Sequence, residues 1–165
     1  HLSSLQLKLK HLGRGSFTDR ANLHMTLKFL GDVPRGGEAD VCDAMTEARG
    51  HAMKLTCEAL QVFGRDIVSV KVGGERNKLF ALYQSLETVL EKRGFAKDTR
   101  RFRPHITLAR RFRPYDGFDA SSVPAPHTDF QVNEMVLFES TRELGKLVYK
   151  PLFICSLSDM TEVIT

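Results

Sequence analysis

The chain has 165 residues, of which 42% are hydrophobic and 27% charged, as in a globular protein with a buried core. No apolar run approaches the ~20 residues that span a bilayer and no signal-peptide pattern opens the chain, so we expect a cytoplasmic location. The 24 Lys and Arg against 20 Asp and Glu give a formal net charge of +4, which is compatible with an anionic ligand such as a nucleotide or RNA.

The first half of the chain predicts two helices and three strands. Apolar spacing indicates a short helix over Ser3–Leu12, which a glycine ends. Alternating apolar residues predict a strand over Asn22–Leu30, and helical spacing follows over Glu38–Arg49. Two further strands, Lys54–Phe63 and Ile67–Val72, are joined by a short Gly-Arg-Asp connection and form a hairpin.

The second half begins with the clearest helix, Asn77–Arg93, whose leucines and valine form one apolar stripe. A strand over Arg103–Arg111 follows a basic loop, and Pro114–Pro126 is rich enough in Pro, Gly and Ser to be a surface loop. Val132–Phe138 and Leu147–Leu157 complete the chain as an antiparallel pair. Helices mixed with hairpins predict an α+β fold.

One tetrapeptide pattern occurs twice, on strands predicted in different halves of the chain. His24–Leu27 has the sequence HMTL and His105–Leu108 has HITL. Alternation along a strand directs His and Thr to one face and the two apolar residues to the other. Each copy can therefore anchor its strand in a core while presenting an imidazole and a hydroxyl to a cleft.

Two histidines presented in this way suit acid–base chemistry at phosphorus. Near neutral pH one imidazole can accept a proton while a second, protonated, donates one. Opening a cyclic phosphodiester needs both actions, one on the attacking water and one on the departing ribose oxygen. Thr26 and Thr107 follow the histidines on the same faces, where their hydroxyls can donate to phosphate oxygens. This chemistry needs no metal or other cofactor.

The segments around the two motifs resemble a known family. NLHMTLKFLGDV and RFRPHITLARR, with the later LFES and GKLVYKPL, are similar to the bacterial and archaeal RNA 2′,3′-cyclic phosphodiesterases, also called 2′-5′ RNA ligases, of the 2H phosphoesterase superfamily. The resemblance runs from about Asn22 to Leu157. It implies one domain over residues 1–165, with two lobes that each carry one HxTL motif. Two antiparallel sheets with outer helices would surround a central cleft with pseudo-two-fold symmetry.

The resemblance also implies roles for particular residues. It implies metal-independent hydrolysis of RNA 2′,3′-cyclic phosphate ends to 2′-phosphates, with His24 as proton donor and His105 as proton acceptor. Arg110 matches an arginine that contacts the nucleotide. Simple alternation places Arg110 on the face opposite His105, so a bulge or strand end must reorient it. The family's short apolar first strand is not seen in this sequence, and we expect it to be missing.

Other functions are also compatible with the sequence. The same two histidines would serve the reverse reaction, 2′-5′ ligation of RNA, and a non-catalytic nucleotide- or RNA-binding module could keep the cleft for recognition alone. The histidines could be buried structural residues, the threonines strand formers and the arginine a solvated charge. Lys28 is as well explained by solvation as by phosphate binding. For hydrolysis, ligation or RNA binding, the expected partner is RNA or an oligonucleotide with a 2′,3′-cyclic phosphate end.

The remaining signals are weaker. Six arginines gather around the second motif and favour a general attraction for anions: Arg100, Arg101, Arg103, Arg110, Arg111 and Arg113. Three aromatic residues flank the same motif and could stack a base, although at least one should pack in the core: Phe102, Phe112 and Tyr115. The three cysteines are odd in number and scattered, which predicts reduced structural thiols: Cys42, Cys57 and Cys155.

Overall fold

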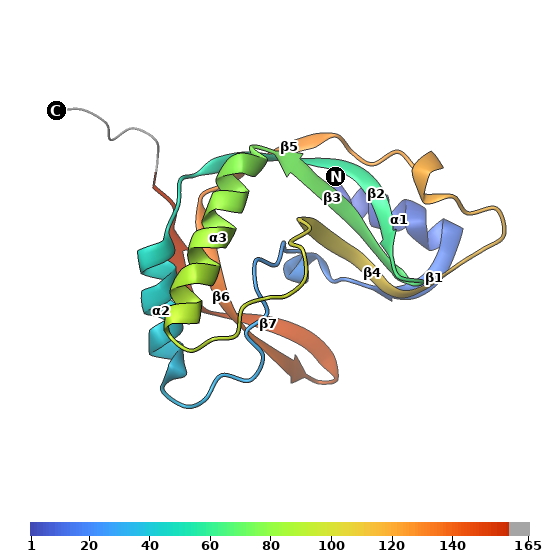
Figure 1. Cartoon of the computed structure of the whole chain (residues 1–165). Helices are drawn as coiled ribbons and strands as arrows, with labels where there is room; N and C mark the ends of the chain where they lie inside the picture. Colours follow the sequence, from blue (N-terminus) through green and yellow to red (C-terminus); the bar gives the residue numbers. More distant parts are fainter. Residues whose placement is uncertain (159–165) are drawn as a thin grey trace. The chain divides into compact units, whose positions relative to one another are not determined.

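The structure, a computed structural model, describes residues 1–158. Helices and antiparallel strands alternate along this part of the chain, with two short 3₁₀ segments at Arg20–Asn22 and Ala120–Ser122 (Figure 1). The strands form a five-stranded sheet and a separate two-stranded sheet. The fold is therefore α+β with two antiparallel sheets, as the sequence predicts.

The chain divides into two compact units, each made of three segments. The first comprises residues 1–26, 55–74 and 102–130, and the second comprises residues 27–54, 75–101 and 131–158. Both histidines and both threonines of the HxTL motifs belong to the first unit.

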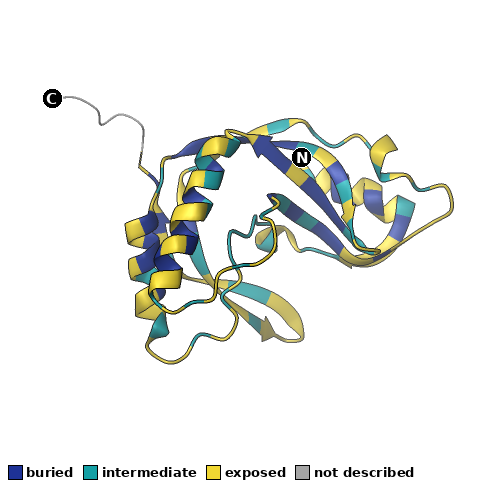
Figure 2. Cartoon of the chain, in the orientation of Figure 1, coloured by how far each residue is buried: buried dark blue, intermediate teal, exposed yellow. Residues whose placement is uncertain are grey.

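The first unit is built on the five-stranded sheet, whose strand order is β1-β4-β3-β2-β5. The strands have the following bounds: β1 Gly13–Phe17, β2 Met53–Phe63, β3 Ile67–Gly74, β4 His105–Pro114 and β5 Thr128–Val132. The central strands β3 and β4 supply much of the core (Figure 2), and their apolar residues Val68, Val70 and Leu108 are fully buried.

Helix α1, Leu2–Leu12, packs against β1 and β4 in the same unit. It buries Leu5 and Leu9, and the Gln6 side chain holds the helix to the sheet. Gln6 Nε2 donates to the backbone oxygens of Thr18, at 2.7 Å, and Leu108, at 3.0 Å. One face of the sheet is thereby covered, and the polar side chains of β3 and β4 lie on the other.

The second unit contains two helices and a hairpin. Helices α2, Gly37–Ala48, and α3, Arg76–Lys92, pack side by side (Figure 1) through apolar stripes of Val, Ala, Met and Leu residues. Strands β6, Glu134–Glu143, and β7, Lys146–Ser156, form the two-stranded sheet. Its inner face contacts α2, where the buried Cys155 thiol donates to the Met45 carbonyl at 3.5 Å.

Most predicted elements are confirmed, with boundaries shifted by a few residues. The helices, the β2–β3 hairpin, the central strand β4 and the final antiparallel pair are all present. The predicted strand over Asn22–Leu30 is wrong: only Met25 makes a bridge there, so no ladder forms. Strands β1 and β5 were not predicted, because β1 has the sequence GRGSF, which shows no apolar alternation.

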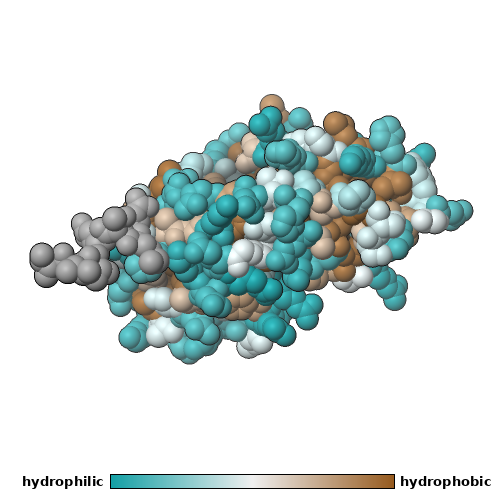
Figure 3. All heavy atoms as spheres, turned by 90° about the horizontal axis from the view of Figure 1, so that it is seen from above, coloured by the Kyte–Doolittle hydropathy of each residue, from teal (hydrophilic) through white to brown (hydrophobic). Residues whose placement is uncertain are grey.

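The surface and the thiols agree with the composition. On the face drawn in Figure 3, hydrophilic side chains dominate and hydrophobic ones show between them, as is usual for a folded protein. Cys42, Cys57 and Cys155 are all free thiols, and the last two are buried. No helix within residues 1–158 is long and apolar enough to cross a membrane.

Candidate active site

The two HxTL motifs meet in the first unit at a single antiparallel bridge between Met25 and Ile106. These are the second residues of the two motifs. Residues that face each other across an antiparallel pair share one side, and their chain neighbours point to the other. The bridge therefore turns the histidine and threonine of each motif to a common side, with each histidine diagonal to the other.

Both imidazoles are held by the same backbone contact. His24 Nδ1 lies 2.7 Å from the Asn22 carbonyl oxygen, and His105 Nδ1 lies 2.6 Å from that of Arg103. A carbonyl oxygen can only accept, so each Nδ1 must carry the proton. In the neutral ring the lone pair then resides on Nε2, and both histidines have the tautomer in which Nε2 exchanges protons.

Phe63 of β2 packs against the His105 ring, with the ring centroids 4.7 Å apart and the planes at 60°. It lies on the same face of the sheet as His105 and restricts the tilt of the imidazole. This contact could not be predicted from the sequence, because Phe63 is an ordinary apolar strand residue 42 positions away in the chain.

A charged pair lies beside His105 on strand β3. Lys71 is the cross-strand neighbour of His105, and its Nζ is 3.2 Å from Glu58 Oε2. Glu58 occupies the space above Gly73, where any side chain on the glycine would collide with the carboxylate. The missing side chain of Gly73 thus allows Glu58 to reach Lys71 beside the imidazole.

Ser69 is the cross-strand neighbour of Thr107. It is fully buried, and its hydroxyl has no hydrogen-bond partner within the described part of the chain. Facing residues of an antiparallel pair have Cβ atoms about 5 Å apart. The phosphate-binding hydroxyl proposed for Thr107 therefore has a second, unpaired hydroxyl beside it.

Arg110 reaches the site face through a β-bulge. Val68 of β3 pairs with Ala109. The next residue of β3, Ser69, pairs with Thr107, so β4 contains one extra residue between the two pairs. The bulge reverses the alternation, and consecutive residues of β4 are buried there before the exposed Arg110. Arg110 consequently projects to the same side as Thr107.

Lys28 is neither solvated nor available to a phosphate. Its side chain is 6% exposed and forms an ion pair with Glu87, which is 3% exposed. Lys28 Nζ also donates to the Ala96 carbonyl at 2.8 Å, and Glu87 Oε2 accepts the Asp98 backbone N–H at 2.8 Å. Both earlier explanations of Lys28 are therefore wrong: it is a buried structural cation of the second unit.

The three flanking aromatic residues have different environments. Phe112 is buried against Phe17 and Phe118, with ring centroids 6.3 and 5.4 Å away. Phe102 is half-buried. Tyr115 is 47% exposed and receives a hydrogen bond from Arg14 Nε at 3.0 Å. Core packing thus accounts for Phe112, and Tyr115 is the most exposed of the three rings.

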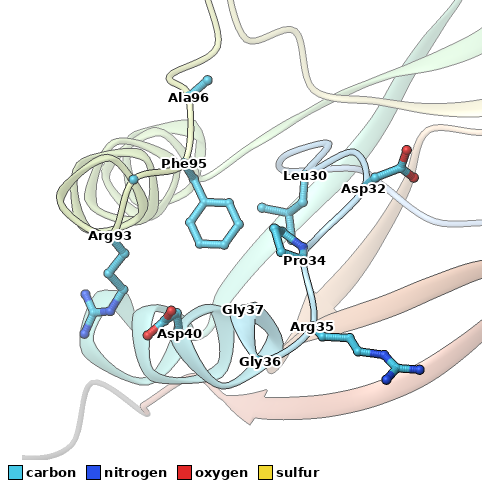
Figure 4. A pocket seen from close by; sticks show the side chains of 11 residues that line it. Leu30, Asp32, Pro34, Arg35, Gly36, Gly37, Asp40, Arg93, Phe95 and Ala96 are labelled. Atoms are coloured by element: carbon cyan, nitrogen blue, oxygen red, sulfur yellow. The ribbon is translucent and has the colours of Figure 1, made fainter.

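A pocket of about 510 Å³ lies in the second unit, between the start of α2 and the end of α3. The Phe95 ring points into it toward Leu30 and Pro34 (Figure 4). None of its lining residues belongs to an HxTL motif, so this pocket is separate from the candidate site.

Comparison with known proteins identifies the family. Residues 4–143 match the model of the 2′-5′ RNA ligase superfamily. An RNA 2′,3′-cyclic phosphodiesterase of Geobacillus stearothermophilus is 36% identical over 128 residues, which are 73% of this chain and 41% of that protein. A protein of the same name from Aeropyrum pernix is 30% identical over 114 residues, 66% of this chain and 65% of that protein. The chain thus spans less than two thirds of either relative.

Solved structures show the same fold. Escherichia coli LigT, crystallised with 3′-AMP, superposes with a TM-score of 0.75 over 95% of this chain and 93% of its own, at 24% identity. A Thermus thermophilus structure gives a TM-score of 0.77 over 96% and 91% of the two chains, also at 24% identity. The chain belongs to the 2′-5′ RNA ligase superfamily.

Proposed function

We propose that this chain hydrolyses RNA 2′,3′-cyclic phosphate ends to 2′-phosphomonoesters without a metal, using His24 and His105 as acid and base. The observation that carries the proposal is the shared state of the two imidazoles. Each Nδ1 proton is committed to a backbone carbonyl two residues earlier, and the Met25–Ile106 bridge turns both rings to one side. The names of the relatives support the choice of substrate.

The chemistry follows from these groups. His105 Nε2 takes a proton from water while the water oxygen attacks phosphorus. The bond from phosphorus to the ribose 3′ oxygen breaks, and protonated His24 gives its Nε2 proton to that oxygen. The product carries a 2′-phosphate and a 3′-hydroxyl, and the two histidines have exchanged protonation states. Exchange with solvent then restores them.

Three further residues would bind the reacting group. The hydroxyls of Thr26 and Thr107 would donate to the non-bridging phosphate oxygens, on which charge increases in the transition state. The guanidinium of Arg110, which the bulge directs to the same side, would bind the nucleotide end of the substrate. A binding module that only recognised nucleotides would not need two histidines in matched tautomers.

The test is turnover of an oligonucleotide with a 2′,3′-cyclic phosphate end in excess EDTA, with identification of the phosphate position in the product. We expect a 2′-phosphate and undiminished activity in EDTA. His24→Ala and His105→Ala should each lose ~100-fold or more in kcat. Absence of turnover by the wild-type protein would refute the proposal, and so would full turnover by the His24→Ala/His105→Ala double variant. A 5′-hydroxyl RNA added to the reaction shows whether the reverse, ligating direction operates as well.

A further inference from the structure

Four exposed arginines lie on β1 and β4, beyond Thr107 on the site face of the first unit. We call this set the arginine row: Arg14, Arg110, Arg111 and Arg113. Arg14 and Arg113 are direct cross-strand partners, and Arg110 pairs with Ser16. The row therefore continues along the strand that carries the second HxTL motif.

The row is electrostatically unfavourable for the isolated fold. Like charges directly opposite each other on neighbouring strands destabilise a sheet. No carboxylate within residues 1–158 forms an ion pair with any of the four guanidiniums, although Lys71, Arg93 and Lys150 each have one elsewhere. An anionic ligand would remove this repulsion, because a phosphate can bridge two guanidinium groups.

The backbone of β4 keeps the row on the site face. Arg111 has a positive φ of 53° and is a second extra residue relative to β1, where Arg14 and Ser16 are paired with Arg113 and Arg110. This bulge lets Phe112 turn to the buried face and returns Arg113 to the side of Arg110. Arg111 Nη2 in turn donates to Ser16 Oγ at 2.9 Å, which ties its side chain to the row.

Tyr115 adds an aromatic surface at the far end of the row. The Arg14 guanidinium carbon lies 5.9 Å from the centroid of its ring, and Arg14 Nε donates to its hydroxyl. Exposed aromatic rings among cationic side chains form the usual platform on which proteins stack single-stranded bases. Positive charge and an exposed aromatic ring therefore occur together at this end of the row.

We propose that the arginine row binds the phosphate backbone of the RNA upstream of its cyclic end, so that the preferred substrate is an oligonucleotide and not a mononucleotide. This rests on the proposed function for the position of the cyclic end. Two of the eight residues from His105 to Arg113 are extra residues of bulges, so at about 3.3 Å for each of the others Arg113 lies on the order of 20 Å along β4 from His105. That distance exceeds one nucleotide, so the row contacts phosphates that a mononucleotide lacks.

The experiment compares a 2′,3′-cyclic mononucleotide with an eight-nucleotide RNA that ends in the same cyclic phosphate. The test variant is Arg14→Gln/Arg113→Gln, and the matched control is Arg35→Gln/Arg49→Gln, which removes the same charge from exposed positions of the second unit. We expect the test variant to raise KM for the octanucleotide ~10-fold or more, with turnover of the mononucleotide unchanged. The control should affect neither substrate.

Binding separates this proposal from the proposed function. His105→Ala is titrated with a fluorescent octanucleotide at several salt concentrations, with and without the two arginine changes. Loss of two phosphate contacts should reduce the slope of log K against log salt by about 1.4. If the octanucleotide binds in a way that depends on the two arginines but the wild type does not turn it over, the proposed hydrolysis is refuted. The proposal that the arginine row binds RNA then stands. Three results would overturn the proposal that the arginine row binds RNA. The two arginine changes could impair both substrates equally, they could leave the octanucleotide unaffected, or polyglutamate could bind as tightly as the octanucleotide.

Tyr115→Ala provides an independent variant, because it leaves every charge in place. We expect it to weaken binding of the octanucleotide several-fold and to leave the mononucleotide unaffected. An unchanged octanucleotide affinity would remove Tyr115 from the site. Thermal unfolding of each variant shows whether the first unit remains folded.

Discussion

Phe63 and His105 are in contact across strands β2 and β4, although β3 lies between these strands in the sheet. The phenyl ring reaches over β3 and lies at 60° to the imidazole. Together with the Arg103 carbonyl on Nδ1, it leaves the imidazole little freedom to rotate. This second support for His105 comes from an apolar side chain.

Loss of the Phe63 ring should therefore affect rate more than binding. We expect Phe63→Ala to lower kcat about 10-fold while KM changes little, because Phe63 orients the base and does not need to touch the substrate. Phe63→Leu should retain most of the rate. Steady-state kinetics on a cyclic-phosphate oligonucleotide measures both constants. Phe29→Ala, at a phenylalanine that is 66% exposed, is the control. A change confined to KM would contradict the orienting role.

The Lys28–Glu87 pair should be costly to break from one side only. Lys28→Met leaves a buried carboxylate without its cation, which costs about 3–5 kcal/mol of unfolding free energy. Lys28→Met/Glu87→Leu should recover most of that loss, because no charge is left buried. Urea denaturation measures both. Lys97→Met, which breaks a pair that is 55% and 54% exposed, should cost less than about 1 kcal/mol. Equal losses for the two single variants would show that burial does not matter here.

Glu75 should make folding sensitive to acid. The Lys54 backbone N–H, which donates to Glu75 Oε2 at 2.7 Å, and the nearby Lys78 ammonium lower the pKa of this carboxyl below its ordinary value of 4.5. A lowered pKa in the folded state means that the carboxylate stabilises the fold above pH 4.5 and that this contribution is lost as the pH falls further.

We therefore expect Glu75→Gln to lower the melting temperature at pH 7 and the difference from wild type to shrink steadily below about pH 4.5. Thermal unfolding followed by circular dichroism between pH 3 and 7 measures the difference. Glu134→Gln, at an exposed carboxylate at the start of β6, is the control for the loss of one surface charge. A Glu75→Gln effect that does not depend on pH would contradict the charged interaction.

Ser69 should be replaceable without loss of stability. Because its buried hydroxyl has no partner in the structure, Ser69→Ala removes no hydrogen bond and relieves an unsatisfied polar group. We expect a change in unfolding free energy between zero and about 1 kcal/mol in favour of the variant. Thr56→Val is the control, because the Thr56 hydroxyl donates to Asp129 Oδ1 at 2.7 Å. That variant should lose about 1–2 kcal/mol. A loss of the same size in Ser69→Ala would show that the hydroxyl is bonded.

Strand structure was predicted best from the sequence where one face of the strand packs on the core and neighbouring strands flank it. In β4 the alternation of buried and half-buried residues from His105 to Leu108 follows the HxTL pattern as expected. It failed at Asn22–Leu30, where an alternating pattern has only Ile106 as a bridging partner. Pattern alone cannot show whether a neighbouring strand is present.

The candidate site shows the same limit. Its histidines and threonines could be selected from a local pattern, because the pattern repeats. The direction of Arg110 depends on how Val68 and Ser69 pair with β4, and the burial of Lys28 depends on Glu87, which is 59 residues away. These are properties of pairing and packing between distant segments, which no short stretch of sequence contains.

The acceptors of the two Nδ1 protons are backbone atoms of Asn22 and Arg103, not their side chains. Any residue at either position offers the same carbonyl oxygen. The tautomer of each histidine is therefore set by the course of the main chain. It can stay the same in relatives whose residues at positions 22 and 103 differ. A search for conserved side chains next to the histidines would miss these two hydrogen bonds, because a backbone acceptor does not restrict which residue occupies its position.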